Sequence, residues 1–380
     1  MPLYDIAAHG AMVGDAQRFD AYSEALRRTI RPGCTVLDIG TGTGVHALLA
    51  CRFGAGRVHA VEPDDVIQLA RRLARANGLA DRIVFHQQSS FRLQLEGPVD
   101  VIVSDLRGVL PLFQRHIPAI VDARRRLLRP GGTLIPLRDV MWAAAVDDAS
   151  LYAGIASPWD GNGHGLDLTA ARDMATQRIY RRRVRIETLL APPQSFAALD
   201  YPTIESPDVS RRLDFTLARD GALHGFALWF DGTLAEGVDL SNAPGNDDLI
   251  YGMSFLPLPQ AVPVAAGDEL SLSLAARLVG SDYVWRWDTA LDGAGGHRHF
   301  AQSSFHGTPV AARTRALAAA QHVPVLSEEG RIERATLAMI DGSASLAEIA
   351  ARLRQRFPEL FESERAALDR VTALALRCAD

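Results

Sequence analysis

Short apolar runs and amphipathic stretches alternate over the first third of the chain. Residues 14–30 carry apolar side chains near helical spacing and end at Arg31-Pro32-Gly33, which predicts a helix that stops there. Five later runs have the length of buried strands, and they are 35–39, 57–61, 83–86, 99–104 and 133–136. Strands that alternate with helices in this way predict a parallel, doubly wound α/β layer.

The clearest of the intervening helices is predicted over residues 63–77. Asp64 and Asp65 stand in its first turn, three arginines stand toward its end, and Asn77-Gly78 stops it. Acids at the beginning of a helix and bases at its end complement the helix dipole, so the charge order agrees with the periodicity.

After about residue 137 the pattern changes to short strand-like runs separated by Gly, Pro, Asp and Asn. These runs are 213–218, 225–229, 269–274 and 283–286. Their spacing predicts an antiparallel sheet or barrel. From about residue 311 the chain becomes helical, and we expect a strand pair (322–326 and 331–334) followed by three helices. The capping box Ser345-x-x-Glu348 begins one of these helices.

These changes of pattern predict three domains. The first covers residues 1–136 and the second covers 137–310, with a helical arm at about 159–190. The third, small and α-rich, covers 311–380. A chain of 380 residues is long enough for two domains and a small third one.

The composition is that of a soluble globular chain, with 48% hydrophobic and 22% charged residues. The net charge is −5, so no basic field favours a nucleic-acid partner. No run of about 18 uncharged apolar residues occurs, so we expect no membrane span.

The cysteines and histidines favour neither a disulfide framework nor a metal site. Cys34, Cys51 and Cys378 form no C-x-x-C pair and no zinc spacing, and the N-terminus lacks the features of a signal peptide. We therefore expect a reducing, cytoplasmic location. His297 and His299 share one face of a strand, but we expect no metal there because no carboxylate or cysteine near them in sequence completes a site.

The most informative motif is an apolar strand that runs into a glycine-rich turn, Val36-Leu37-Asp38-Ile39-Gly40-Thr41-Gly42-Thr43-Gly44-Val45. Glycines let the backbone approach a ligand closely, and the helix that follows offers free N–H groups. The dinucleotide fingerprint would need glycine at position 45, and Asp38 would repel a pyrophosphate. S-adenosylmethionine has an ammonium and a sulfonium and no phosphate, which suits Asp38. Glu62, at the end of the next strand, suits a ribose diol.

Together with the strand at 99–105 and the turn Leu128-Arg129-Pro130-Gly131-Gly132, this set resembles the class I S-adenosylmethionine-dependent methyltransferases. The resemblance implies a Rossmann-like domain with S-adenosylmethionine as cofactor and S-adenosylhomocysteine as product. It places Gly40, Gly42 and Gly44 along the cofactor.

The resemblance sharpens to the protein arginine methyltransferases over most of residues 4–290. The run 9–18 (HGAMVGDAQR) resembles that family's N-terminal lid helix. The resemblance implies that His9 lines the cofactor and that Arg18 grips the methionine carboxylate, for which a guanidinium fork is well shaped. Ser89 and Ser90 fall where the family has an adenine-contacting pair ending in Glu, so Ser90 is a departure.

Three later runs extend the resemblance. Residues 159–168 resemble the start of the family's dimerisation arm, 224–236 a barrel strand pair, and 241–244 the approach to its Thr-His-Trp loop. The resemblance therefore implies a Rossmann-like domain, an antiparallel β-barrel and a homodimer.

The acceptor loop departs from the family pattern. The family places two glutamates nine residues apart after the fourth strand, where they clamp a planar cation with a pKa above 12. This chain has Asp105 and the neutral Gln114 at those positions, and Arg107 brings a new positive charge. If Arg107 points inward it would repel a guanidinium, by about 4 kcal/mol at roughly 4 Å. If it points to solvent, the effect is much smaller.

The Thr-His-Trp loop is also absent, because Leu249-Ile250-Tyr251 occupies its place. Tyr251 and Met12 are weaker candidates for the acceptor pocket. Asp105 is the best candidate for a base or a positioning group, because it ends a strand at the carboxyl edge of the sheet.

These features predict a methyltransferase that modifies nitrogen or oxygen of a small molecule or peptide. One alternative is a genuine methyltransferase of free or protein arginine that uses Asp105 with Gln114. Another is a peptide-binding scaffold without turnover.

The last segment has a resemblance of its own. Residues 340–349 (IDGSASLAEI) resemble the small winged-helix PqqD-like domains, which hold leader peptides of ribosomally made natural products. This resemblance implies a winged-helix-like C-terminal domain.

Overall fold

The computed structural model describes residues 5–161, 165–293 and 295–378. Residues 162–164, within the predicted arm, lie outside the described residues. The chain divides into two compact units between Pro309 and Val310, and each unit is described by itself.

The first unit begins with the predicted parallel sheet, whose strand order is β3-β2-β1-β4-β5. Its strands are β1 (Thr35–Ile39), β2 (Arg57–Val61), β3 (Ile83–His86), β4 (Val99–Ser104) and β5 (Leu128–Ile135). β1 pairs with β2 on one side and with β4 on the other, so the strand order reverses there. Ligands of open α/β sheets bind beside such a point, at the carboxyl ends of the strands.

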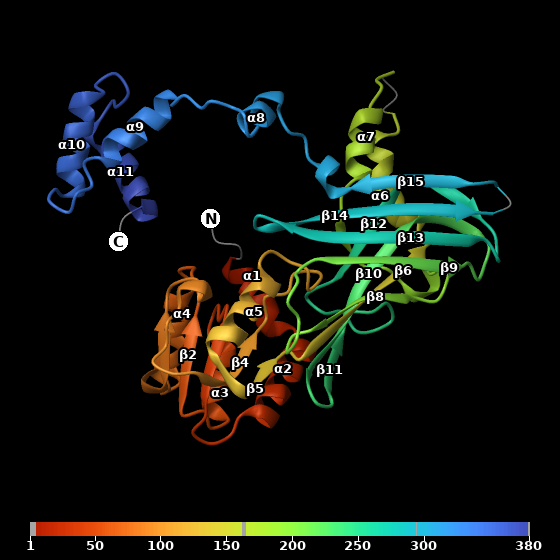
Figure 1. Ribbon diagram of the computed structural model, residues 1–380, viewed down its shortest axis with the longest axis horizontal. Helices are drawn as coiled ribbons and strands as arrows, with labels where there is room; N and C mark the ends of the chain where they lie inside the picture. Colours follow the sequence, from red (N-terminus) through yellow and green to blue (C-terminus); the bar gives the residue numbers. More distant parts are fainter. Residues whose placement is uncertain (1–4, 162–164, 294, 379–380) are drawn as a thin grey trace. The chain divides into compact units, whose positions relative to one another are not determined.

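Helices flank this sheet (Figure 1). They are α1 (Ile6–Gly14), α2 (Ala16–Thr29), α3 (Val45–Arg52), α4 (Ile67–Ala76) and α5 (His116–Arg126). Asp15 begins α2, because its carboxylate accepts a hydrogen bond from the Arg18 N–H at 3.0 Å. The predicted helix at 63–77 begins only at Ile67. The preceding residues form a turn in which the Asp64 N–H donates to Glu62.

The second part of this unit consists of antiparallel strands, as predicted. One sheet contains β6 (Arg138–Val146), β7 (Tyr180–Arg182), β8 (Gln194–Asp200), β10 (Gly221–Ala235), β11 (Val238–Ser241) and β12 (Met253–Val264). The other contains β9 (Val209–Thr216), β13 (Glu269–Val279), β14 (Asp282–Asp292) and β15 (Arg298–Ser303). Fully buried aromatic side chains, among them Phe215, Phe226 and Trp287, belong to one core cluster that spans both sheets and the parallel layer.

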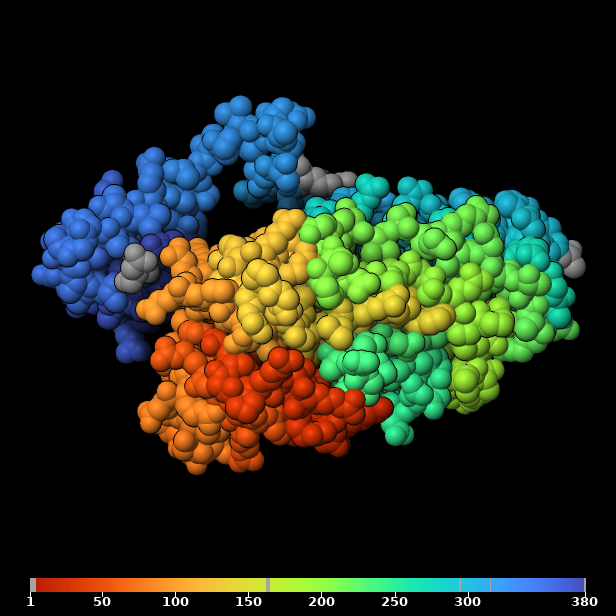
Figure 2. Space-filling model, turned by 60° about the horizontal axis from the view of Figure 1, so that its bottom comes forward, coloured from red at the N-terminus to blue at the C-terminus, as the bar shows by residue number. Residues whose placement is uncertain are grey.

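Two short helices cover one end of the antiparallel part, α6 (Ala149–Ala156) and α7 (Thr169–Thr176). In the described part of the predicted arm, helix consists of α7 and two short 3₁₀ turns, Ser157–Trp159 and Ile186–Thr188, and the chain returns to the sheet at β7 between α7 and the second turn. In the space-filling view the yellow segment that leads from β5 into β6 lies between the parallel and antiparallel parts (Figure 2).

The second unit is helical, with α8 (Ala312–Leu317), α9 (Glu328–Leu337), α10 (Leu346–Arg356) and α11 (Glu364–Cys378). The capping box of Ser345 and Glu348 is confirmed at the start of α10. The predicted strand pair is wrong, since residues 331–334 lie inside α9. Ser327 caps this helix and acids fill its first turn, and a short apolar run alone does not distinguish strand from helix. None of the described helices is long and apolar enough to cross a membrane.

A chain truncated after Pro309 should keep the stability of the first unit. The core cluster of that unit contains no residue beyond 309, so its unfolding temperature should equal that of the same transition in the full chain. Calorimetry on both chains makes the comparison. A lower unfolding temperature of the truncated chain would show that the two units stabilise each other.

Candidate functional site

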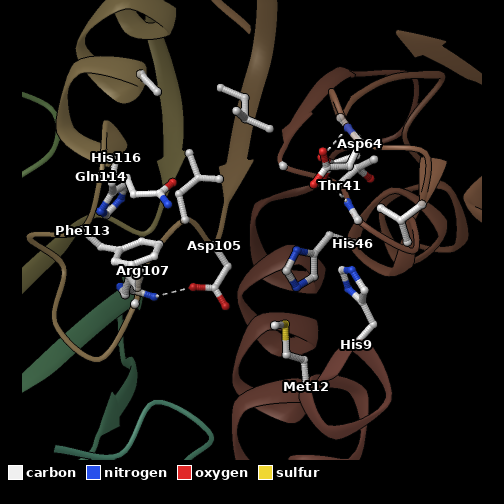
Figure 3. A pocket seen from close by; sticks show the side chains of 18 of the residues that line it. His9, Met12, Thr41, His46, Asp64, Asp105, Arg107, Phe113, Gln114 and His116 are labelled. Atoms are coloured by element: carbon white, nitrogen blue, oxygen red, sulfur yellow. Dashed lines mark hydrogen bonds and ion pairs between the residues drawn. The ribbon is translucent and has the colours of Figure 1, made fainter. Parts of the chain in front are cut away.

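A cavity of about 700 Å³ opens at the carboxyl ends of β1, β2 and β4 (Figure 3). Its walls come from α1 and α2, the glycine turn after β1, the loop between β4 and α5, and the loop before β12. It therefore lies at the switch point of the parallel sheet, where the topology places a ligand site.

The glycine turn brings backbone against this cavity. Gly40 and Gly44 have φ angles of +69° and +84°, in the left-handed region that favours glycine. A Cβ on Gly40 would lie 2.4 Å from Leu106 Cδ2, and one on Gly42 would lie 3.1 Å from His9 Cε1. No larger residue fits these positions without displacing a neighbour, so glycine here allows Leu106 and His9 to pack closely on the turn that borders the cavity.

Asp38 lies beneath the glycine turn and is fully buried. Its Oδ2 accepts hydrogen bonds from the Thr41 hydroxyl at 2.5 Å and the Ala47 N–H at 3.1 Å. Its Oδ1 has no hydrogen-bond partner among the described residues. Burial raises the pKa of Asp38 to about 7, against the opposing effect of these hydrogen bonds. Asp38 thus shapes the turn from below and is not part of the cavity wall.

Glu62 lies on the cavity wall at the end of β2. Its Oε2 accepts from the Gly42 N–H at 3.0 Å and its Oε1 from the Asp64 N–H at 3.1 Å. Each carboxylate oxygen keeps a free lone pair, which suits the two hydroxyls of a ribose. Ser89 and Ser90 line the cavity further along, where the short 3₁₀ helix Ser90–Arg92 begins.

α1 and α3 add side chains on the other side of the cavity, where Figure 3 shows His9, Met12 and His46 near one another. His46 stacks on the Tyr22 ring with centroids 4.6 Å apart, and burial lowers its pKa to about 4. The sequence analysis did not name His46 as a cavity residue. The only indication in the sequence was its position two residues after Gly44.

Arg18, Asp105 and Tyr251 meet at the acceptor end of the cavity. Arg18 contacts Asp105 Oδ2 through Nε at 2.7 Å and Nη2 at 2.5 Å, and the Tyr251 hydroxyl donates to the same oxygen at 2.7 Å. Burial alone would raise the pKa of Asp105, but Arg18, Arg107 and the Tyr251 hydroxyl together lower it to about 2. The three predicted residues are brought together, and Asp105 is ionised.

Asp15 connects this group to the loop before β12. Its Oδ2 accepts a hydrogen bond from the Ile250 N–H at 2.6 Å, while its Oδ1 caps α2. The residue after Ile250 is Tyr251, so this contact places the Tyr251 hydroxyl over the cavity.

Arg107 points inward, the first of the two orientations left open by the sequence. Its Nε and Nη2 each donate to Asp139 at 2.8 Å, and its Nη1 donates to the Tyr22 hydroxyl at 2.7 Å. The Tyr201 hydroxyl also donates to Asp139. The expected repulsion of a guanidinium by an inward Arg107 therefore requires correction, because Asp139 compensates this charge within a bidentate pair.

Sequence reasoning also missed Asp139 as the partner of Arg107. The signal was present, since Asp139 interrupts an apolar stretch that becomes β6. A charged residue at a fully buried strand position indicates a buried partner.

The second glutamate position of the loop holds Gln114, which is half-buried. Gln114 has φ +42° and is the one residue other than glycine with positive φ in the described parts of the chain. Two residues further, His116 is buried and lines the cavity, and Figure 3 shows it beside Gln114.

The described residues contain no group of three His, Cys, Asp or Glu side chains that could hold a metal ion. A carboxylate does stand near the predicted histidine pair, since His297 Nδ1 lies 2.7 Å from Asp292 Oδ1. Both side chains are exposed, so this is a surface hydrogen-bond contact.

Arg107→Met should lower the free energy of unfolding by about 3–5 kcal/mol, because it leaves the Asp139 carboxylate buried without its cation. Urea unfolding measures the change. Arg107→Met combined with Asp139→Asn should recover most of the loss, and a double variant as unstable as the single one would contradict the pairing. Arg125→Met, which removes an exposed ion pair with Glu205, is the matched control and should cost about 0–1 kcal/mol.

Asp38→Asn should flatten the pH dependence of stability of the ligand-free protein. Because its pKa is raised to about 7, Asp38 stays protonated to a higher pH in the folded chain than in the unfolded chain. The free energy of unfolding therefore falls as pH rises from about 4 to 7. The difference between variant and wild type should grow by up to about 1.4 kcal/mol per pH unit in this window. Denaturant curves of both proteins at each pH measure this difference. If the stability of variant and wild type changed equally with pH, the pKa of Asp38 would not be raised by folding.

Comparison with known proteins gives two family matches that divide the first unit between them. Residues 22–136 match the model described as ribosomal protein L11 methyltransferase, and residues 138–284 match the arginine methyltransferase oligomerization subdomain.

Curated relatives agree with these matches. The arginine N(omega)-methyltransferase of Streptomyces achromogenes subsp. streptozoticus is 32% identical over 291 residues, which are 73% of this chain and 77% of that protein. The probable protein arginine N-methyltransferase 6 of Arabidopsis thaliana is 29% identical over 235 residues, 60% of this chain. That match spans only about half, 54%, of the Arabidopsis protein.

Solved structures share the fold. The Trypanosoma brucei PRMT1 enzyme-prozyme complex with AdoHcy superposes with a TM-score of 0.73 at 21% identity, over 79% of this chain and 98% of that one. Protein arginine methyltransferase 10 of Arabidopsis thaliana gives 0.70 at 23% identity, over 79% and 97%. By its sequence relatives and its fold, this chain belongs to the arginine methyltransferase family of class I S-adenosylmethionine-dependent methyltransferases.

Proposed function

We propose that this enzyme transfers the methyl group of S-adenosylmethionine to a nitrogen atom of a small molecule or peptide. The observation that carries the proposal is the ionised, buried Asp105 at the end of β4, at the acceptor end of the cavity. Localisation in the cytoplasm and assembly into a homodimer stay predictions.

The donor end of the cavity fits the cofactor. Gly40 and Gly42 border the cavity without side chains, and Glu62 keeps lone pairs for a ribose. In this proposal Gly42 and Gly44 continue the cradle, His9 covers it, and Ser89 and Ser90 contact the adenine. When bound, S-adenosylmethionine supplies an electrophilic methyl group.

Arg18 has two tasks in this proposal. It would bind the methionine carboxylate of the donor while it keeps its contact with Asp105. A guanidinium has five N–H donors, and Arg18 uses Nε and Nη2 on Asp105 and Nη1 on the Met12 carbonyl at 3.0 Å. The remaining donors on Nη1 and Nη2 suit a second carboxylate. Arg18 thereby fixes the distance between donor and acceptor, which is the main task in an in-line displacement.

The choice of nitrogen over oxygen follows from the ionisation of the cavity. A hydroxyl acceptor needs a base, but the pKa of Asp105 is about 2 and those of His46 and His116 are about 4. A carboxylate acceptor needs no base, but the Asp105 carboxylate would repel it. A neutral amine attacks the methyl carbon through its own lone pair as the bond from that carbon to sulfur breaks, and the methylated nitrogen then loses its extra proton to water. Asp105 attracts such a nitrogen through its N–H groups.

The guanidino group of arginine, free or in a protein, is the second candidate acceptor. Asp105 Oδ1 has no hydrogen-bond partner in the described parts of the chain, and Arg107 Nη1 lies 3.6 Å from it. An N–H of a planar cation could occupy this position. The names of the relatives favour the same acceptor, while the neutral Gln114 in place of a second acid weighs against it.

Asp105→Asn tests the proposal. It removes the charge but keeps an oxygen for Arg18 and Tyr251, so S-adenosylhomocysteine should bind with a similar Kd in calorimetry. Methyl transfer, measured as S-adenosylhomocysteine release over a panel of amines, guanidines and peptides, should fall by about 100-fold or more. Asp122→Asn, which removes an acid paired with Arg126 on α5, is the control.

Unchanged turnover in Asp105→Asn would show that Asp105 has no part in the reaction. Absence of S-adenosylhomocysteine binding to the wild type would remove the proposed donor site. Binding without turnover on any acceptor class would favour the alternative of a scaffold without catalysis.

A further inference from the structure

The antiparallel part of the first unit contributes a charged side chain to the cavity wall. Its lining residues are Arg181 of β7, Ile250 and Tyr251 of the loop before β12, and Ser281 of the turn between β13 and β14. Tyr251 contacts Asp105 through its hydroxyl. Arg181 takes no part in the proposed donor site, although it brings a full positive charge to this wall.

The loop before β12 holds the Arg181 side chain in place. The Arg181 Nη2 donates to the Ile250 carbonyl, and the side chain lies along Gly252. A Cβ on Gly252 would lie 2.9 Å from Arg181 Nε and 3.2 Å from its Cγ. Arg181 is nevertheless exposed, and one contact uses only one of the five N–H donors of a guanidinium. The group is therefore fixed in position with donors to spare.

No acid compensates the charge of Arg181 within the described parts of the chain. Arg18 and Arg107 also line the cavity, but each of them is paired with a buried acid. Arg183, two residues further along the chain, has an acid partner at the surface. A cation on a cavity wall without a counter-charge favours an anionic group of a ligand as its partner.

Arg115 is the remaining arginine of the cavity wall, and it lies toward the donor end. Its guanidinium lies over the Phe91 ring, 4.3 Å from the ring centre. Phe91 directly follows Ser90, which is proposed to contact the adenine. Arg181 is therefore the uncompensated arginine at the acceptor end of the cavity.

The Tyr251 side chain spans the space between Asp105 and Arg181. Its hydroxyl donates to Asp105 Oδ2 at 2.7 Å, while the carbonyl of the preceding residue accepts from Arg181. The negative and the positive group thus lie at the two ends of one tyrosine side chain. A ligand that meets both has N–H groups at one end and an anion several bonds away.

We propose that Arg181 binds a carboxylate of the acceptor, several bonds away from the nitrogen that is methylated. This inference rests on the proposed function and deepens it. The two oxygens of the carboxylate accept hydrogen bonds from the guanidinium of Arg181, whose planar fork matches their geometry. The carboxylate belongs to a free amino acid or to an acidic residue of a peptide, since both present the same group.

Charge order then selects the acceptor. A diamine would bring a second positive charge to Arg181, and a dicarboxylate would bring a negative charge to Asp105. Repulsion at one end disfavours each of them, so an acceptor with both charges is preferred. Because Arg181 is exposed, solvent screens its charge, and we expect an effect of about tenfold on the Kd.

The test uses the full chain saturated with S-adenosylhomocysteine and three pairs of probes that differ in one carboxylate. The pairs are lysine and cadaverine, arginine and agmatine, and two blocked dipeptides, acetyl-Lys-Asp-amide and acetyl-Lys-Asn-amide. In calorimetry the carboxylate-bearing member of at least one pair should bind about tenfold more tightly than its partner. A preference in the first two pairs identifies a free amino acid as the source, and a preference in the dipeptides identifies an acidic peptide.

Three variants separate recognition of the carboxylate from support of the loop. Arg181→Gln removes the charge but keeps an N–H for the Ile250 carbonyl, so the ratio of the two Kd values in the pair should fall to about one. Arg181→Glu should invert the ratio. Loss of loop structure would weaken both members of a pair equally and leave the ratio unchanged.

Arg182→Met is the matched control, because it removes an exposed positive charge from the same strand at a position outside the cavity wall. It should keep the wild-type ratio. All variants should keep the wild-type affinity for S-adenosylhomocysteine.

Equal binding of both members in every pair by the wild type would overturn the assignment, and so would a wild-type ratio in Arg181→Gln. Absence of binding by all six probes would overturn it as well. These results leave the donor site intact. Failure of S-adenosylhomocysteine itself to bind would instead overturn the proposed function.

Discussion

Two buried ion pairs hold the loop between β4 and α5, and the acceptor end of the cavity depends on them. Arg18 of α2 pairs with Asp105, and Asp139 of β6 pairs with Arg107, two residues further along the same loop. Each pair joins elements far apart in the sequence. A charge taken out of water is tolerated only when its partner and hydrogen bonds are complete, so the loop has little freedom to move without breaking a pair. Tyr22, Tyr201 and Tyr251 complete these contacts with their hydroxyls.

The same pairs decide the chemistry that the cavity can support. Arg107 brings a charge into the acceptor loop, but Asp139 compensates it, and Arg18 keeps Asp105 ionised. What remains at the acceptor end is a carboxylate that attracts N–H groups and is too weak a base to activate a hydroxyl. The arrangement therefore differs in its residues from two flanking glutamates, and it is the basis of the proposed methyl transfer to nitrogen.

Local sequence patterns were sufficient to predict the parallel layer, because the apolar strand runs and the glycine turn after β1 are each formed by residues that are neighbours in the sequence. The expected strand pair at 322–334 failed because a short apolar run has no period long enough to separate strand from helix, and Ser327 capped a helix instead. For the residues around Asp105, the sequence named the members but not their contacts: Asp105 and Tyr251 were expected at the acceptor and Arg18 at the donor. Asp105, Arg18 and Tyr251 were all named, yet their meeting at one carboxylate oxygen joins positions 87 and 146 residues apart.

The sequence by itself therefore determined the cofactor class and the order of the folded parts, which follow from residue type, short-range spacing and the family resemblance. It also named Arg18, Asp105 and Arg107, which the structure places on the cavity wall. Only the tertiary structure decided which charge pairs with which, that Arg107 is compensated by Asp139, and that His116 is buried beside the cavity. The physical reason is that burial and pairing set the charge of a group, and both depend on residues brought together from distant parts of the chain.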